Sequence, residues 1–321
     1  MLKVGVPETV DPELLKKFPV GIEMVRIPSK PESDYEVEFW VAPTNPEAAC
    51  EMLPHLHGVR VVQALLAGVD WLLDIVPEGV QLCDAQGAHN ISTAEWTVAA
   101  ILGALKYFPF YMELQRAGNW KRRREANDYF RTMHGIEKQF HPPVLVEELH
   151  GKHVLIVGYG AIGSEIEKRL LPFGVRISRV ARREREGVAG VKKLHELLPL
   201  ADVVVLIVPL TPETTGMIGT KELALLKQGA LLVNAARGPV VTTDALVEAL
   251  HAGRIRAALD VTDPEPLSEG HPLWSAPNLL LTPHVAGSSP MFLVRGIELA
   301  AEQVRRYMRG EPLRYVVSGH Y

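Results

Sequence analysis

The stretch His153-Val-Leu-Ile-Val-Gly158-Tyr-Gly160-Ala-Ile-Gly163 decides the fold of this chain. An apolar run typical of a buried strand leads directly into the pattern Gly-x-Gly-x-x-Gly, and a helical pattern follows it. In this setting Gly158 allows a tight turn, Gly160 lets the backbone approach a pyrophosphate, and Gly163 lets helix and strand pack closely. The start of the helix then offers unpaired N–H groups to phosphates. Glycine-rich turns also join strands to helices without a ligand, but both flanks fit here, so the sequence predicts a dinucleotide site.

The segments that follow this turn complete an α/β fold. Short apolar runs alternate with helical patterns, which is typical of a parallel sheet with crossover helices. Six strands would give the number found in a full dinucleotide-binding fold. The expected strands are Val154–Val157, Val175–Val180, Val203–Val208, Ala230–Asn234, Ala257–Asp260 and Leu279–Thr282.

The first part of the chain shows the same alternation of strands and helices. With 321 residues, the chain exceeds one ordinary domain. We therefore expect two α/β domains with parallel, doubly wound sheets, formed by residues 1–92 with 290–321 and by residues 93–289. In the first part, the expected strands are Leu2–Val6, Glu38–Val41, Val59–Leu65 and Val80–Asp84, and the expected helices are Asp11–Lys17 and Pro46–Leu53.

The residues between the two predicted domains, and those after the second, have different sequence patterns. Ser92 and Glu95 have the spacing of a capping box, so we expect a long apolar helix from Thr93 to about Phe108 that bridges the domains. The following residues, Gln115–Leu149, read as irregular and basic around positions 121–124. Such a run usually forms a solvated face, and a contact with a cofactor phosphate or another subunit is the alternative. Met291–Arg309 reads as an amphipathic helix.

The end of the second strand bears on which dinucleotide binds. NAD sites place an acidic residue about 20 positions beyond the glycines, where it binds the ribose hydroxyls. At that place this chain has Ala181 followed by Arg182 and Arg183. Arginine can bind a 2′-phosphate with two hydrogen bonds, whereas a carboxylate would repel it. The sequence therefore favours NADP. The arginines could instead be ordinary surface residues, and Glu184 keeps NAD possible if the strand register differs.

Three charged residues follow later strands. Arg237, Asp260 and His284 each lie at or just past the expected C-terminal end of a strand, the edge where open α/β sheets bind ligands. Reduction of a 2-keto acid needs a cation for the carboxylate, which suits arginine, and a proton donor for the carbonyl oxygen, which suits histidine. Glu265 could orient and stabilise the imidazolium.

Each of these residues also has a simpler explanation when it is taken alone. An arginine after a strand is usually a surface charge, a histidine after Thr-Pro is usually a loop residue, and Glu265 between two prolines could stiffen a turn. Their joint occurrence behind a dinucleotide motif favours a catalytic set.

The composition excludes several other classes of function. Hydrophobic residues make up 47% and charged residues 22%, as in an ordinary globular protein. The net charge of −4 and the pI of about 6.3 give no basic field that would attract nucleic acid or acidic membranes. Cys50 and Cys83 are too few for a metal cluster or a disulfide framework, and no apolar run is long enough to span a bilayer. We expect no metal and a cytoplasmic location.

Several motifs together resemble the D-2-hydroxyacid dehydrogenase family, and within it the glyoxylate and hydroxypyruvate reductases. The similarity covers about residues 55 to 315 and is weak over the first 50 or so residues. Besides the glycine motif, it rests on Ala67-Gly-Val-Asp70, Thr93-Ala-Glu95, Arg116-Ala-Gly-Asn-Trp120, Pro209-Leu-Thr-Pro-Glu-Thr214, Asn234-Ala-Ala-Arg-Gly238, Asp260-Val-Thr-Asp-Pro-Glu-Pro-Leu267, His271-Pro-Leu-Trp274 and Pro277-Asn-Leu-Leu-Leu-Thr-Pro-His284.

The resemblance implies a role for each matching residue. Arg237 would orient the substrate, His284 would be the acid/base and Glu265 its partner, while backbone amides around Ala67 and Gly68 would hold the substrate carboxylate. It also implies a flavodoxin-like substrate domain beside the NAD(P)-binding domain, an active site in the cleft between them, and a homodimer that pairs through the cofactor domain. Implied cofactor contacts, besides the three motif glycines, Arg182 and Arg183, are Ala161, Ile162, Pro209, Thr214, Ala235, Ala236, Arg237, Asp260, His284 and Gly287.

These expectations lead to one main hypothesis and two alternatives. The main hypothesis is hydride transfer from NADPH to a small 2-keto acid, with glyoxylate or hydroxypyruvate first. A second hypothesis keeps the fold and changes the substrate to a phosphoglycerate or 2-ketogluconate type. A third is a nucleotide-sensing binding protein, which the absence of an added regulatory tail or basic domain disfavours. Residues 121–146 depart from the family in length and charge, so substrate closure or dimer contacts could differ.

Overall fold

The computed structural model describes residues 1–317 and contains two compact α/β units. One unit comprises Met1–Ile91 together with residues 287–317, and the other comprises Ser92–Ala286. Both are built on parallel sheets, which confirms the expected fold class. Whether the units fold as independent domains with the expected boundaries stays a prediction. No helix among residues 1–317 is both long enough and apolar enough to cross a membrane.

The second unit is a seven-stranded sheet in which every neighbouring pair is parallel. Its strand order is β10-β9-β8-β11-β12-β13-β14, so the chain adds β9 and β10 on one side of β8 and then reverses direction to add β11 to β14 on the other side, as in dinucleotide-binding folds. All six predicted strands are confirmed, and the two-residue β10 was missed. The strands are β8 (His153–Val157), β9 (Arg176–Ala181), β10 (Ala189–Gly190), β11 (Val203–Leu206), β12 (Leu231–Asn234), β13 (Arg256–Leu259) and β14 (Leu279–Leu281).

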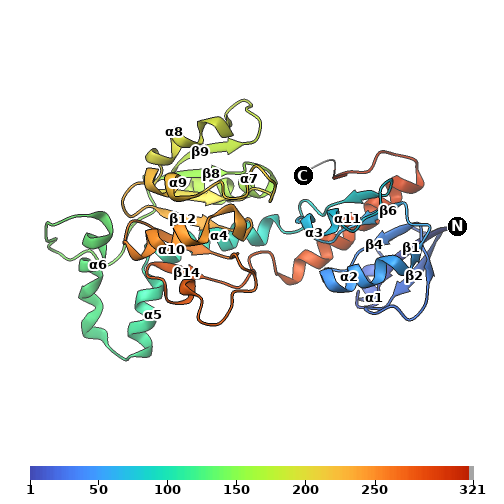
Figure 1. Cartoon of the computed structure of the whole chain (residues 1–321), viewed down its shortest axis with the longest axis horizontal. Helices are drawn as coiled ribbons and strands as arrows, with labels where there is room; N and C mark the ends of the chain where they lie inside the picture. The colour runs from blue at the N-terminus through green and yellow to red at the C-terminus, as the bar shows by residue number, and fades with distance from the viewer. Residues whose placement is uncertain (318–321) are drawn as a thin grey trace. The chain divides into compact units, whose positions relative to one another are not determined.

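Helices cover both faces of this sheet, and the central strands β8, β11, β12 and β13 are mostly apolar and buried (Figure 1). In β8, Val154 and Ile156 join one buried cluster, whereas Leu155 and Val157 join the cluster on the opposite face. This alternation is the period of two that a strand imposes on its side chains. The main covering helices are α4 (Asn90–Leu105), α7 (Ala161–Leu170), α9 (Thr220–Leu225) and α10 (Thr243–His251), with the shorter α8 (Leu194–Leu197).

The first unit contains a five-stranded parallel sheet in the order β2-β1-β4-β6-β7. Counted along the chain this is 2-1-3-4-5, the order of flavodoxin-like sheets. Helix α11 (Pro290–Met308), predicted from its amphipathic pattern, packs its apolar side into the same buried cluster as β1 and β4. The strands are β1 (Leu2–Pro7), β2 (Ile22–Ile27), β4 (Phe39–Val41), β6 (Val61–Gln63) and β7 (Gln81–Cys83), and β3 (Tyr35–Glu36) pairs with β5 (Leu56–His57) apart from them; the short helices are α1 (Pro12–Leu15), α2 (Pro46–Met52) and α3 (Asp70–Leu73).

Strand β2 was missed because its sequence, Ile-Glu-Met-Val-Arg-Ile, interrupts the apolar run with two charges. It is an edge strand of the sheet, and only Ile27 among its residues is fully buried. An edge strand needs fewer apolar residues than a central one, so its signal in the sequence is weak.

The predicted capping box is wrong. Helix α4 begins at Asn90, so Ser92 lies inside its first turn, and the Ser92 hydroxyl donates instead to the carbonyl oxygen of Ala286 at 2.7 Å. The same helix was expected to continue to about Phe108, but it ends at Leu105. Tyr107 adopts a left-handed backbone with φ of 55°, which redirects the chain into α5 (Phe108–Arg116).

The segment expected to be irregular contains a second helix. After a short 3₁₀ turn at Trp120–Arg124, helix α6 spans Glu125–His134 and ends at Gly135, whose φ is 62°. The charges of this segment hid an amphipathic pattern that buries Ala126 and Met133. The basic side chains at 121, 122 and 124 are exposed. We call Phe108–Val146 the arm, and Figure 1 shows its helices α5 and α6 leading away from the sheet of their unit.

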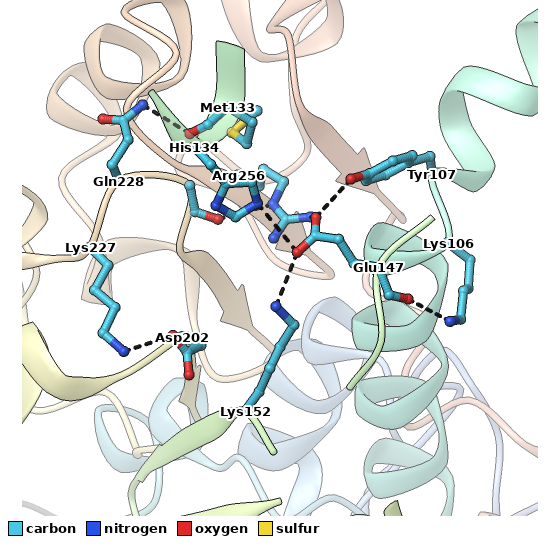
Figure 2. A network of polar contacts seen from close by, with 11 residues as sticks. Lys106, Tyr107, Met133, His134, Glu147, Lys152, Asp202, Lys227, Gln228 and Arg256 are labelled. Atoms are coloured by element: carbon cyan, nitrogen blue, oxygen red, sulfur yellow. Dashed lines mark hydrogen bonds and ion pairs between the residues drawn. The ribbon is translucent and has the colours of Figure 1, made fainter. Parts of the chain in front are cut away.

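A buried carboxylate anchors the end of the arm (Figure 2). Glu147 Oε1 accepts hydrogen bonds from the Tyr107 hydroxyl at 2.9 Å and Arg256 Nη1 at 2.8 Å. Its Oε2 accepts from Lys152 Nζ at 3.0 Å and lies 3.3 Å from His134 Nε2. Burial alone would raise the pKa of Glu147, but His134, Arg256 and Lys152 together hold this pKa well below its ordinary value. The ionised carboxylate therefore joins the arm to β8 and β13.

We predict that Glu147→Gln lowers the free energy of unfolding by about 3–5 kcal/mol, because it leaves the buried guanidinium of Arg256 without its counter-charge. The folded-state pKa of Glu147 is depressed, so its stabilisation is present above the unfolded pKa of about 4.3 and is lost as the pH falls further. The difference in stability between wild type and variant should thus be constant near neutral pH and shrink in acid.

Urea unfolding at several pH values measures this difference, and Glu148→Gln is the matched control because Glu148 is exposed. A Glu147→Gln protein as stable as the control would show that the buried network does not anchor the arm.

Candidate active site

The turn after β8 has the geometry that the glycine motif predicts. Gly158 has φ of 101°, and a Cβ on it would lie 2.4 Å from the carbonyl oxygen of Ile207, so only glycine fits. A Cβ on Gly163 would lie 3.1 Å from the oxygen of Gly158, which shows how closely helix and strand approach. Gly160 caps α7 and faces open space, because a Cβ there would meet nothing nearer than 4.0 Å.

The start of α7 beside this turn is suited to an anion. The helix has ten residues and no side-chain cap, and Ala161 and Ile162 form its first turn. The N–H groups of such a turn point outward and favour an anion. The open side at Gly160 is therefore suited to a pyrophosphate, which fits a bound nicotinamide dinucleotide.

The predicted phosphate-binding arginines lie at the next strand end. Strand β9 ends at Ala181, and Arg182 and Arg183 follow it on an exposed segment. Because β8 and β9 are parallel, the carboxyl end of β9 lies at the same edge of the sheet as the glycine turn. The neighbouring Glu184 is also exposed.

The loops after β11 and β12 lie at the same edge of the sheet, on the other side of β8. After β11, the Thr214 hydroxyl donates to the carbonyl oxygen of Pro209 at 2.7 Å and accepts from the Thr211 N–H at 2.8 Å, so its side chain shapes the loop. After β12, Ala235 and Ala236 lead to Arg237, whose guanidinium is half-buried and donates to the Ala236 carbonyl oxygen at 2.9 Å.

Asn234 is a positioning residue that our sequence reasoning quoted but gave no role. Its side chain is buried at the end of β12, where its Nδ2 donates to the Arg237 carbonyl oxygen at 3.0 Å and its Oδ1 accepts from the Ala236 N–H at 3.0 Å. These two bonds fix the backbone that carries Arg237. An asparagine at the end of an apolar strand, directly before two small residues, is the signal that could have identified it.

The two residues expected to act together are in contact. His284 Nδ1 lies 2.5 Å from Glu265 Oε1, and both side chains are partly exposed. Since Glu265 engages Nδ1, the other ring nitrogen of His284 is left to face a ligand. The pair borders a pocket of about 360 Å³ whose other lining residues are mainly apolar: Asp260, Thr262, Pro266, Leu267, Trp274, Leu281, Thr282 and Pro283.

Asp260 holds the loop that carries His284. It is only 2% exposed, and its carboxylate accepts from the Thr282 hydroxyl at 2.6 Å, the Val285 N–H at 2.9 Å and the Ala286 N–H at 2.8 Å. Its backbone oxygen accepts from the His284 N–H at 2.6 Å. His284 itself has φ of 52°, a left-handed conformation that costs energy in a non-glycine residue and needs such support. The sequence reasoning expected a cofactor contact from Asp260 and missed this positioning role.

The remaining predicted residues belong to the first unit. Ala67 and Gly68 lie half-buried in the turn between β6 and α3. Gly287 follows the His284 loop, and a Cβ on it would lie 2.9 Å from His89 Nδ1. The roles that the resemblance implies for these three residues stay predictions. Among residues 1–317, no group of three or more His, Cys, Asp or Glu side chains could hold a metal ion.

The chain is similar in sequence to proteins of known families. Residues 98–286 match the family model "D-isomer specific 2-hydroxyacid dehydrogenase, NAD binding domain". The chain is 35% identical over 272 residues to a glyoxylate reductase of Aeropyrum pernix, which covers 82% of this chain and 77% of that protein. It is also 35% identical over 295 residues to a D-3-phosphoglycerate dehydrogenase of Methanocaldococcus jannaschii, covering 88% of this chain but only 52% of that protein.

A solved structure with a similar fold comes from Sinorhizobium meliloti. It is an NADPH-dependent glyoxylate/hydroxypyruvate reductase in complex with NADP and sulfate. The TM-score is 0.80 at 25% sequence identity, and the match covers 99% of this chain and 98% of that one. The likeness therefore extends over both units.

We predict that Asp260→Asn destabilises the protein by about 1–3 kcal/mol. The amide replaces one carboxylate oxygen with an NH₂ group, which cannot accept a hydrogen bond from the backbone N–H that it faces. Denaturant unfolding measures the effect. Asp263→Asn makes the same chemical change at an exposed position and should be neutral. Equal stability of the two variants would show that the Asp260 carboxylate does not hold the His284 loop.

Proposed function

The chain belongs to the D-isomer specific 2-hydroxyacid dehydrogenase family, and from this premise we propose that it reduces glyoxylate or hydroxypyruvate with NADPH. As a member of that family it is an NAD(P)-dependent oxidoreductase that acts on 2-keto and 2-hydroxy acids. The observation that carries the proposal is the His284–Glu265 contact at the sheet edge that also bears Arg237 and the glycine turn. The proposed substrate is supported by two relatives described above, the glyoxylate reductase of Aeropyrum pernix and the glyoxylate/hydroxypyruvate reductase of Sinorhizobium meliloti.

In the proposed reaction, Arg237 binds the carboxylate of the keto acid and fixes the orientation of its carbonyl group. A guanidinium suits this task because its planar fork matches a carboxylate. When bound beside the glycine turn, a reduced nicotinamide cofactor would supply the hydride for the keto carbon. His284 donates a proton to the carbonyl oxygen as negative charge develops there, and Glu265 stabilises the protonated imidazole and holds its orientation. Oxidation of the hydroxy acid would use the same groups in reverse.

The proposed preference for NADPH rests on the two arginines after β9. Arg182 and Arg183 stand beyond Ala181, where a carboxylate would be needed to bind the ribose hydroxyls of NAD. Their exposed guanidinium groups suit a 2′-phosphate. The Sinorhizobium meliloti relative with NADP bound supports this choice.

The reduction of another acid remains the second candidate. The phosphoglycerate dehydrogenase from Methanocaldococcus jannaschii is as similar in identity as the glyoxylate reductase from Aeropyrum pernix. This chain spans about half of that phosphoglycerate dehydrogenase, however, whereas it spans 77% of that glyoxylate reductase. The glyoxylate and hydroxypyruvate reductase from Sinorhizobium meliloti, which matches 99% of this chain, supports the smaller acid.

We also propose that the chain acts as a homodimer in the cytoplasm. The arm presents large apolar side chains to solvent, with Phe108 56%, Met112 50% and Trp120 79% exposed, and a second copy would cover them. In the described residues Cys50 and Cys83 are both free thiols, which agrees with a reducing compartment.

Steady-state assays test the proposed reaction. We expect oxidation of NADPH, followed by the loss of its absorbance, to be rapid with glyoxylate or hydroxypyruvate, slow with 2-ketogluconate or phosphohydroxypyruvate, and slower with NADH in place of NADPH. Rapid turnover of phosphohydroxypyruvate alone would favour the second candidate. Tight cofactor binding without turnover of any of these acids would contradict the proposal.

His284→Ala should lower kcat by about 100-fold or more while changing the Kd for NADPH less than a few-fold, because the imidazole donates the proton but is not the main anchor of the cofactor. The control is His251→Ala, which removes an exposed histidine from α10 and should leave kcat unchanged. Equal losses of turnover and cofactor affinity in His284→Ala would remove it from the role of proton donor.

A further inference from the structure

Tyr159, the aromatic residue inside the glycine turn, contacts two guanidinium groups. Arg179 Cζ is 5.5 Å and Arg185 Cζ is 5.8 Å from the centre of the Tyr159 ring, both within the range of a cation–π interaction. Arg185 Nη2 also donates to the Tyr159 carbonyl oxygen at 2.5 Å. Tyr159 therefore contacts strand β9 and the segment after it with both its ring and its backbone.

Arg179 connects the same ring to helix α7. Its guanidinium donates to both carboxylate oxygens of Glu167, including Nε to Oε2 at 2.6 Å, and Glu167 is 6% exposed. The hydrogen bonds with Arg179 lower the pKa of the Glu167 carboxyl, so this ion pair is intact at neutral pH. Arg179 Nη1 reaches the carbonyl oxygen of Gly187 at 3.4 Å, which adds a second contact with the segment after β9.

That segment is a compact hairpin. The backbones of Arg185 and Val188 exchange two hydrogen bonds, at 3.0 and 2.9 Å, around a turn in which Gly187 has φ of 69°. Ala181 pairs with Gly190 at its base. Arg182 and Arg183 thus lie on a short stretch between the end of β9 and a residue bonded to the glycine turn. The Arg183 side chain makes no hydrogen bond or ion pair with the described residues.

We propose that Tyr159, Glu167, Arg179 and Arg185 form a clamp that positions the Arg182–Arg183 stretch beside the glycine turn and so sets the selectivity for NADPH over NADH. This inference rests on the proposed use of NADPH and extends it to residues that act at a distance from the phosphate. The clamp joins the two parts of the chain that would meet the two phosphate groups on the adenosine ribose: the glycine turn would face the 5′-pyrophosphate, and the stretch after β9 would face the 2′-phosphate.

The physical reason is the entropy of an exposed loop. An unrestrained stretch bearing two arginines would lose backbone and side-chain freedom each time it closed on a phosphate, which weakens binding. The clamp removes part of this loss before the cofactor arrives. NADH has no 2′-phosphate and would gain little from the ordered arginines, so the benefit falls on NADPH alone.

The test compares the Kd values of NADPH and NADH, measured by titration of reduced-nicotinamide fluorescence without any keto acid. We expect Arg185→Ala and Tyr159→Leu each to raise the Kd for NADPH about fivefold while changing the Kd for NADH less than twofold. Arg185→Lys, which keeps the charge and one donor for the Tyr159 carbonyl oxygen, should recover part of the selectivity. Arg176→Ala is the control, since it removes one positive charge at the opposite end of β9.

Each outcome decides between distinct possibilities. Loss of selectivity in Arg185→Ala but not in Tyr159→Leu would make Arg185 a direct phosphate contact and overturn the clamp. Loss of affinity for both cofactors in parallel, or a loss equal to that of Arg176→Ala, would also overturn it. A wild type without preference for NADPH would contradict the cofactor proposal and the clamp together. Failure to reduce glyoxylate or hydroxypyruvate, with the expected Kd changes intact, would contradict only the proposed reaction.

Discussion

The parallel pairing of β8 with β9 on one side and β11 on the other is the constraint on which the site depends. Parallel strands joined by crossover helices bring all their carboxyl ends to one edge of the sheet. The same pairing brings the carbonyl oxygen of Ile207, just beyond β11, so close to Gly158 that no side chain fits there. The glycine of the dinucleotide turn is therefore required by the sheet itself, besides any requirement of a ligand.

Two buried carboxylates organise the second unit in different places. Asp260 accepts from one hydroxyl and two backbone N–H groups and supports the left-handed backbone of His284. Glu147 accepts from a tyrosine, an arginine and a lysine and joins the arm to β8 and β13. A buried charge is tolerated only when donors surround it, so each carboxylate imposes the arrangement of the groups around it. One arrangement carries the proposed proton donor, and the other anchors the end of the arm.

Charged side chains were the main source of error in reading the sequence. The basic run before Glu125 concealed helix α6, because the apolar residues that this helix buries are few and widely spaced. Strand β2 escaped notice because Glu23 and Arg26 interrupt its apolar run. Ser92 has the spacing of a helix cap, yet its hydroxyl bonds to Ala286, nearly 200 residues away in the sequence. Local patterns cannot reveal a partner that only the folded chain brings near.

Sequence patterns were enough to predict the two α/β units and the six main strands of the second sheet, because apolar periodicity and glycine spacing are local properties of the chain. The contact of His284 with Glu265 was expected from the chemistry of the two side chains and from the family resemblance. Only the tertiary structure decided what Asp260, Asn234, Glu147 and Tyr159 do. Their roles depend on which donors, acceptors and rings surround them, and those neighbours come from distant parts of the chain. The sequence around a polar residue at a strand end or in a turn looks the same whether that residue binds a ligand or stabilises a loop. Only its neighbours in the folded structure distinguish the two roles.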